Sequence, residues 1–185
     1  MGSKSRIMDF VLDGINQVDD GRGICDLFSG SGSLAGAIGQ QCPVHSNDIQ
    51  RYSRVLADTY NKAFIEKGIP TAAEIIKKAE AIVERNRIKV DGKFDKSMSL
   101  KNFNDIENKQ RELIDRNFEY EWHLFSKYYS GTWWSYEQCL WIDAIREVAE
   151  TYKKKSFYPV VLSSLMFGMA YACLLYTSPS PRDRG

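Results

Sequence analysis

The sequence predicts an α/β fold with a helical insertion, and three observations support this. Two short apolar runs, Ile24–Phe28 and Pro43–Ile49, flank a glycine-rich turn and a small-residue stretch that is typical of a close-packed helix. A segment with helical apolar spacing follows the second run, and a densely charged segment comes next. The chain has 185 residues, 43% of them apolar, which is enough for about one domain with a buried core.

Residues 1–70 are expected to begin a doubly wound parallel sheet. An amphipathic helix is predicted from Lys4 to Asp20, because the apolar residues there keep a helical spacing. The two apolar runs are predicted strands, and Ser33–Gly39 is the helix between them. A second amphipathic helix is predicted over Arg51–Lys67, with Gly68 as its stop. Strands and helices therefore alternate as a parallel sheet requires.

Residues 71–150 are predicted to form a helical insertion or target-recognition region. From Thr71 to Arg116, 20 of 46 residues are charged, against 26% for the whole chain. Such a shift in composition indicates solvated helices outside the sheet. Thr71 with Glu74, and Ser135 with Gln138, have the spacing of a capping box at a helix start.

Residues 151–173 are predicted to return to the sheet as a buried helix. Residues 156–181 carry no charge and could cross a bilayer by length alone. Residues 174–185, however, differ abruptly in composition from the residues before them. We expect them to be a non-native tail that is attached to a fragment of a longer protein. Without that tail the apolar segment Val160–Ala172 is too short to span a bilayer, so the prediction is a buried helix and no membrane partner.

Charge and cysteine content exclude several classes of protein. Lys and Arg number 25 against 24 Asp and Glu, so the net charge of +1 by itself indicates neither nucleic acid nor membrane binding. The four cysteines have neither the spacing of a zinc site nor that of a disulfide framework. The start of the chain does not read as a signal peptide. These features predict a cytoplasmic protein without a metal centre.

The most specific feature is the run Asp26-Leu-Phe-Ser-Gly-Ser-Gly32, with Asn47-Asp-Ile49 behind it. Gly30 and Gly32 allow a tight turn after the first strand and let a ligand approach the main chain. Asp48 follows the second strand, where a carboxylate can accept hydrogen bonds from both hydroxyls of a ribose. The pair predicts a site for an adenosine cofactor.

Two cofactors compete for that site. The glycines, with Ala35, formally match the dinucleotide fingerprint, which keeps NAD and an oxidoreductase activity open. However, the carboxylate of Asp26 at the strand end would repel a pyrophosphate and attract the ammonium and sulfonium groups of S-adenosylmethionine. The residues therefore favour S-adenosylmethionine.

At these motifs the sequence resembles the adenine-specific DNA methyltransferases of the Dam-like group. The resemblance includes the opening Met1-Gly-Ser-Lys4, and weaker matches lie at 129–132, 137–139 and 162–166. It implies an S-adenosylmethionine-dependent methyltransferase fold with a Rossmann-like sheet, incomplete in this chain. The cofactor-binding residues that it implies are Gly2, Lys4, Asp26, Phe28, Ser29, Gly30, Gly32, Asp48 and Ile49.

The resemblance also implies the reaction, which is methyl transfer to the exocyclic amine of adenine in double-stranded DNA, in a restriction-modification or phage setting. The catalytic motif of this family is Asp or Asn, then Pro-Pro, then Tyr or Phe. No Pro-Pro pair occurs in the sequence. We therefore assign no catalytic residue, and expect a C-terminally truncated fragment that is inactive by itself. A non-catalytic module that binds cofactor or DNA remains the alternative.

Aromatic residues crowd the segment before the second capping box. Trp133 and Trp134 lie near Tyr128, Tyr129 and Tyr136 in the sequence. They could form a stacking surface for nucleic acid, or they could be core and interface aromatics at the start of a capped helix. The sequence leaves both interpretations open.

Overall fold

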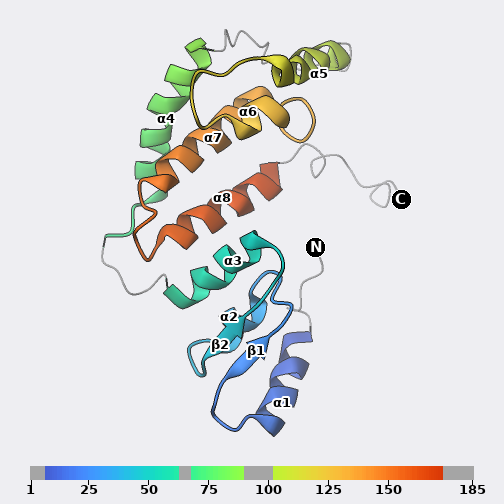
Figure 1. Cartoon of the computed structure of the whole chain (residues 1–185), viewed down its shortest axis with the longest axis vertical. Helices are drawn as coiled ribbons and strands as arrows, with labels where there is room; N and C mark the ends of the chain where they lie inside the picture. Colours follow the sequence, from blue (N-terminus) through green and yellow to red (C-terminus); the bar gives the residue numbers. More distant parts are fainter. Residues whose placement is uncertain (1–6, 63–67, 90–101, 173–185) are drawn as a thin grey trace. The chain divides into compact units, whose positions relative to one another are not determined.

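A computed structural model describes residues 7–62, 68–89 and 102–172 (Figure 1). The chain divides into two units. Unit 1 comprises Met1–Ile69 with Lys154–Ser163, and unit 2 comprises Pro70–Lys153 with Ser164–Gly185. The predicted tail at 174–185 and the helix end at 63–67 lie outside the described residues.

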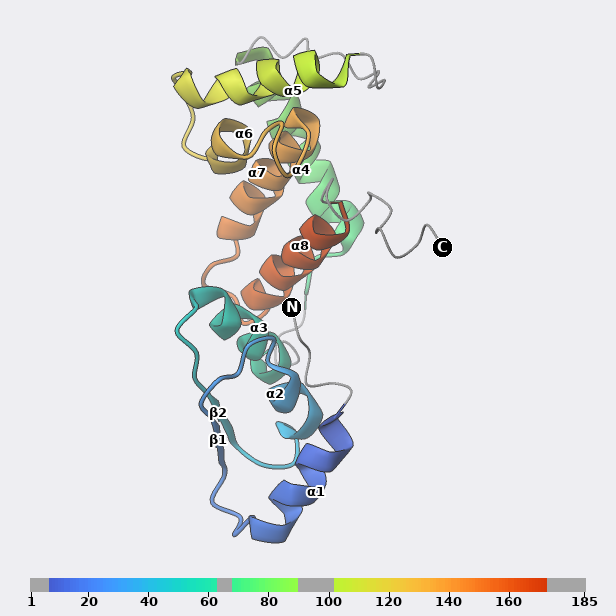
Figure 2. The same ribbon diagram turned by 90° about the vertical axis from the view of Figure 1, so that its right-hand side faces the viewer.

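Unit 1 contains the predicted strand, turn, helix and strand. Its elements are α1 (Met8–Val18), β1 (Ile24–Asp26), α2 (Ser33–Ile38), β2 (Val44–Ser46) and α3 (Arg51–Lys62). The two strands lie side by side in parallel (Figure 2). Their register pairs Ile24 with Val44 and Asp26 with Ser46. Both strands are shorter than the apolar runs that predicted them. The described residues thus show a two-stranded parallel sheet, and the larger doubly wound sheet stays a prediction.

Small residues let α2 and α3 approach closely. A Cβ atom added at Gly32 would lie 3.1 Å from the backbone nitrogen of Ala57, and one at Gly36 would lie 2.8 Å from the ring of Tyr60. Leu34, Ala35 and Ile38 of α2 are buried. The small-residue composition of this helix therefore serves packing, as the sequence predicted.

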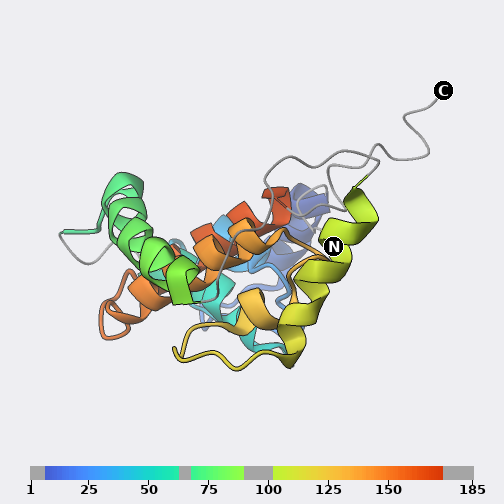
Figure 3. The ribbon, with the colours of Figure 1, turned by 90° about the horizontal axis from the view of Figure 1, so that it is seen from above.

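Every described regular element of unit 2 is helical. They are α4 (Ala72–Lys89), α5 (Phe103–Arg111), a 3-10 helix (Glu112–Asp115), α6 (Leu124–Tyr128), α7 (Tyr136–Glu150) and the part of α8 (Tyr158–Ala172) from Ser164 on. Helices α6 and α7 lie between α4 and α5 (Figure 3). The buried core of α4, the 3-10 helix and α7 consists of Ala79, Val83, Leu113, Tyr136, Leu140, Ala144 and Val148. Tyr136 is therefore a core residue and takes no part in a surface.

Both predicted capping boxes are present. The backbone N–H of Thr71 donates to the Glu74 carboxylate at 2.7 Å, and that of Glu74 donates to the Thr71 hydroxyl at 3.3 Å. Ser135 and Gln138 exchange the same pair of bonds at 2.8 and 3.3 Å. These contacts satisfy backbone donors at the starts of α4 and α7, which is why both helices begin where the sequence predicted.

The last helix, α8 (Tyr158–Ala172), contains the predicted apolar segment. Pro159, Val161 and Ser163 are its buried residues, all within unit 1. Over the described part of the chain, no helix combines the length and the apolar character that a bilayer crossing demands.

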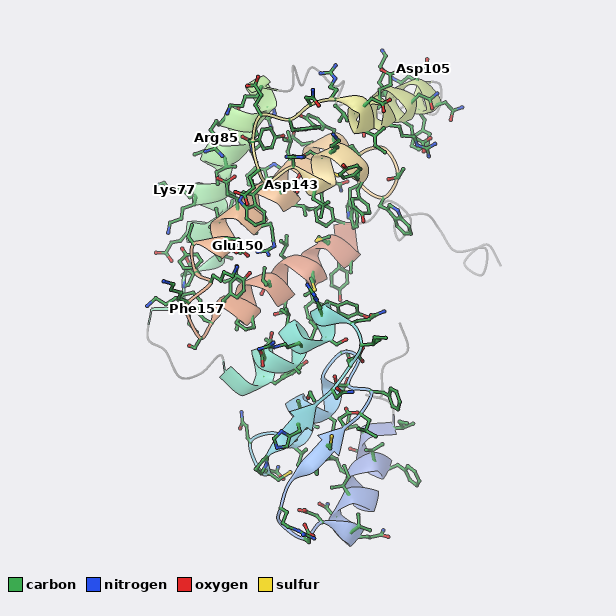
Figure 4. All side chains as sticks on the ribbon, viewed as in Figure 1. Lys77, Arg85, Asp105, Asp143, Glu150 and Phe157 are labelled. Carbon is green, nitrogen blue, oxygen red and sulfur yellow. The ribbon has the colours of Figure 1, made fainter. Side chains whose placement is uncertain are left out.

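A buried carboxylate holds α6 against α7. Asp143 of α7 (Figure 4) is 3% exposed, and its two oxygens accept the backbone N–H groups of Phe125 at 3.0 Å and Ser126 at 2.7 Å. Burial raises the pKa of Asp143, although these two N–H groups act in the opposite direction. The contact satisfies donors at the start of a short helix that has no side-chain cap of its own.

Asp143→Asn is expected to remove a pH-dependent part of the stability. Because the folded-state pKa lies above the unfolded value of about 3.9, the folded chain binds this proton more tightly. The contribution of Asp143 to the free energy of unfolding is fully present below the pKa of the unfolded state. It is lost as the pH rises through the pKa of the folded state. Urea denaturation from about pH 4 upward, followed by tryptophan fluorescence, measures the difference. Parallel pH profiles for the two proteins would contradict the expectation.

Candidate functional site

The predicted motifs meet at the carboxyl edge of the two-stranded sheet in unit 1. The loop after β1 follows Asp26, whose carbonyl accepts the backbone N–H of Asn47 at 2.8 Å. The backbone N–H of Ser29 donates to the carbonyl of Asn47 at 2.9 Å. Parallel strands bring their carboxyl ends to one edge, and these two bonds join the glycine-rich loop to the segment that follows β2.

Two glycines give the loop its path. Gly30 and Gly32 have φ angles of +50° and +72°, where only glycine is unstrained. Gly32 is buried against α3, whereas a Cβ atom added at Gly30 would meet nothing within 4 Å. The Gly32 position therefore serves packing, and the Gly30 position leaves open space beside the backbone.

Asp48 is bonded directly to the glycine-rich loop. Its Oδ2 accepts the backbone N–H of Gly30 and its Oδ1 accepts that of Gln50, both at 2.9 Å. These donors, Gln50 first and Gly30 second, lower the pKa of Asp48. A carboxylate offers about four acceptor positions, so Asp48 is an ionised acceptor that can receive further hydrogen bonds.

Asn47 fixes the loop, a role that the sequence motif did not indicate. Besides its two backbone bonds, its side-chain Nδ2 donates to the carbonyl of Leu27 at 3.0 Å. One residue thus bonds Asp26, Leu27 and Ser29. The sequence feature that could have indicated this role is the position of Asn47, directly after the second strand and one residue before Asp48.

The remaining predicted residues differ in exposure. Asp26 and Ser29 are buried at 8% and 4%, and the Asp26 carboxylate accepts the backbone N–H of Phe28 at 3.3 Å. The side chains of Phe28 and Ile49 are 79% and 97% exposed. The glycine-rich loop and the residues after β2 therefore combine carboxylates and backbone polar groups with exposed apolar side chains. Gly2 and Lys4 lie outside the described residues.

No metal site is found in residues 7–62, 68–89 and 102–172, since no three or more His, Cys, Asp and Glu side chains there gather as ligands. His45 on β2 is exposed. His123 stacks on the ring of Phe118 with centroids 4.8 Å apart, and its Nδ1 contacts the carbonyl of Tyr120. His123 is thus held by a ring contact and a backbone contact.

A family model described as D12 class N6 adenine-specific DNA methyltransferase matches residues 1–163. No curated protein matches the chain. No solved structure matches it either. The family match covers the whole site described above.

Proposed function

This chain belongs to the D12 class of N6 adenine-specific DNA methyltransferases, and we propose that its glycine-rich loop and Asp48 hold S-adenosylmethionine for the methylation of adenine in double-stranded DNA. When bound, the cofactor supplies the methyl group that is transferred. The chain's residues bind and orient it, and their fixed charges act on its charged groups.

The hydrogen bond from Gly30 to Asp48 carries this proposal. It joins the two motifs, which are separate in sequence, into one site at the sheet edge. In the proposal, the two ribose hydroxyls donate to the Asp48 carboxylate, which offers about four acceptor positions. Open space beside Gly30 lets a ligand approach the loop.

The other residues of the site suit the remaining parts of the cofactor. Asp26 places a carboxyl group at the end of β1, where negative charge attracts the ammonium and sulfonium groups. The exposed side chains of Phe28 and Ile49 offer apolar surface for an adenine ring. Gly2 and Lys4 are proposed to help at the methionine end, on the resemblance alone. The larger methyltransferase sheet, the helical insertion at 71–150 and a cytoplasmic restriction-modification setting are likewise part of the proposal.

The sequence contains no Pro-Pro pair and therefore none of the family's catalytic motif. We propose that these 185 residues bind the cofactor but do not transfer its methyl group by themselves. The second candidate is a module of this family that binds cofactor or DNA without catalysis. The sequence of the gene on either side of this segment would distinguish the two, because only the enzyme requires a D/N-P-P-Y/F motif.

A thermal shift assay with S-adenosylmethionine and with NAD tests the cofactor. We expect S-adenosylmethionine to raise the melting temperature, because a ligand that binds only the folded state stabilises it. NAD should have no comparable effect. Stabilisation by NAD alone would refute the proposal and support an oxidoreductase.

Gly30→Ala is expected to weaken S-adenosylmethionine binding by about tenfold or more, because its Cβ atom would enter the open space beside the loop. The cost to folding should be only about 1–2 kcal/mol, since the strain is confined to one left-handed residue. Isothermal titration calorimetry gives the affinity and urea denaturation gives the stability.

Gly21→Ala is the matched control for Gly30→Ala. Gly21 has a φ of +78°, and a Cβ atom there also meets nothing within 4 Å. It should lose a similar amount of stability and keep its affinity for the cofactor. Equal affinities for the two variants would show that the space beside Gly30 is not used.

A further inference from the structure

Unit 2 displays an aromatic surface that the proposed cofactor site does not use. Between α6 and α7 the chain makes a tight turn, in which Ser130 and Trp134 are bridge partners. Tyr129 is 36% exposed and Trp133 is 47% exposed, whereas Trp134 is partly buried. We call Tyr129, Trp133 and Trp134 the aromatic platform.

The rings of the aromatic platform are in contact with one another. Tyr129 lies edge-on to Trp134 with centroids 6.1 Å apart, and Trp133 is tilted against Trp134 at 6.5 Å. Phe125 of α6 supports both Tyr129 and Trp134, at 5.1 and 5.6 Å. The exposed rings therefore sit on a buttressed aromatic cluster instead of projecting singly into solvent.

The turn beneath the platform is rigidly held. The backbone N–H of Gly131 donates to the carbonyl of Trp134 at 2.9 Å, and the Ser130 hydroxyl donates to the carbonyl of Ser126 at 2.7 Å. The indole N–H of Trp134 donates to the carbonyl of Met169 at 3.1 Å. Because these bonds already fix the turn and the ring of Trp134, a partner that covers the platform orders less of the chain on binding.

A cation precedes the platform by two residues in the sequence, in α6. The Lys127 ammonium is 5.6 Å from the ring centroid of Tyr128 and donates to the carbonyl of Arg116 at 2.9 Å. An ammonium has three donors, so it can also contact an anion. Proteins that bind single-stranded nucleic acid combine aromatic rings, which stack on bases, with cations, which meet phosphate.

We propose that the aromatic platform stacks on an unpaired base of the DNA substrate, with Trp133 as the principal ring and Lys127 beside the phosphate backbone. This inference rests on the proposed function for its identification of DNA as the partner. Enzymes that act on a base take it out of the helical stack, which leaves base faces uncovered. A flat, exposed indole is complementary to such a face, and the apolar contact requires no particular sequence.

Trp133→Ala tests the proposal by fluorescence anisotropy with a labelled duplex that contains one unpaired adenine. We expect the variant to bind this DNA about tenfold more weakly than the original chain, and Trp133→Phe to retain most of the affinity because it keeps a ring. Phe10→Ala, which truncates an 81% exposed ring on α1, is the control and should leave the affinity unchanged. Equal affinities for Trp133→Ala and the original chain would overturn the proposal.

A photochemical cross-link tests the same contact without any substitution. A single-stranded oligonucleotide carrying 5-iododeoxyuridine should cross-link to Tyr129 or Trp133 of the intact chain, as mapped by mass spectrometry. Cross-links confined to other peptides would overturn the proposal, and so would a chain that binds no DNA.

Self-association and the cofactor site are checked separately. If Trp133→Ala converts an oligomer into a monomer and leaves DNA affinity unchanged, the platform is a contact between copies of the chain and the proposal is wrong. Isothermal titration calorimetry of the same variant with S-adenosylmethionine measures the affinity of the proposed cofactor site, which lies in unit 1. Lost DNA affinity with intact cofactor binding supports the platform, and absent cofactor binding with intact DNA affinity refutes only the proposed cofactor site.

Discussion

Asp48→Ala is expected to abolish S-adenosylmethionine binding, with an affinity loss of about 100-fold or more. The variant loses the acceptor proposed for both ribose hydroxyls, and each charge-assisted hydrogen bond contributes about 1.5–3 kcal/mol. It also frees the backbone N–H of Gly30, which the carboxylate holds at 2.9 Å. Loss of this contact loosens the loop at the point where the cofactor is proposed to lie. Isothermal titration calorimetry measures the effect.

Asp48→Asn separates the two contributions. Each carboxylate oxygen accepts one backbone N–H, from Gly30 and Gln50. An amide has only one oxygen, so its NH₂ group must face one of these donors. We expect an affinity between that of Asp48→Ala and that of the original chain. Asp13→Ala, which removes an exposed carboxylate from α1, is the control for charge and should not change binding. Unchanged affinity in Asp48→Ala would refute the ribose role.

The β-α-β unit was predictable because its determinants are local. Apolar runs, a glycine-rich turn and small residues specify strand, loop and helix within a few positions of each other. The strand ends were less predictable. The run Ile24–Phe28 is apolar at its end, yet β1 stops at Asp26 and the ring of Phe28 is 79% exposed. Leu27 and Phe28 belong to the glycine-rich loop, and their apolar character reflects the surface of the site instead of a sheet face.

The sequence predicted contacts between residues that are close in the chain, but not contacts between residues that are far apart. The capping boxes follow from residues three positions apart and were predicted. The cap that Asp143 supplies to α6 joins residues 17 and 18 positions apart, so no local pattern indicates it. The aromatic residues before α7 show the same limit. Tyr136 is 2% exposed and Trp133 is 47% exposed, and only the turn geometry determines which ring is core and which is surface.

Gly131→Ala is expected to destabilise unit 2 by about 2–5 kcal/mol, the sum of left-handed backbone strain and overpacking. Gly131 has a φ of +73°, and an added Cβ atom would lie 2.7 Å from the carbonyl oxygen of Glu107 and 2.8 Å from Cβ of Gln110. Neither neighbour can yield easily, because one is backbone and Gln110 is buried with its side chain bonded to the backbone N–H of Tyr136. Urea denaturation followed by tryptophan fluorescence measures the loss.

Gly168→Ala provides a control of opposite sign in the same unit. Gly168 lies within α8, where a Cβ atom would meet nothing within 4 Å, so the added methyl should stabilise the helix by about 0.5–1 kcal/mol. A Gly131→Ala variant as stable as the original chain would show that α5 does not pack on the turn as described. Because Gly131 closes the turn that carries Trp133, the same variant should also bind the unpaired-adenine duplex more weakly, whereas Gly168→Ala should bind it normally. The two glycines thereby connect the stability of the turn to the proposed use of the aromatic platform.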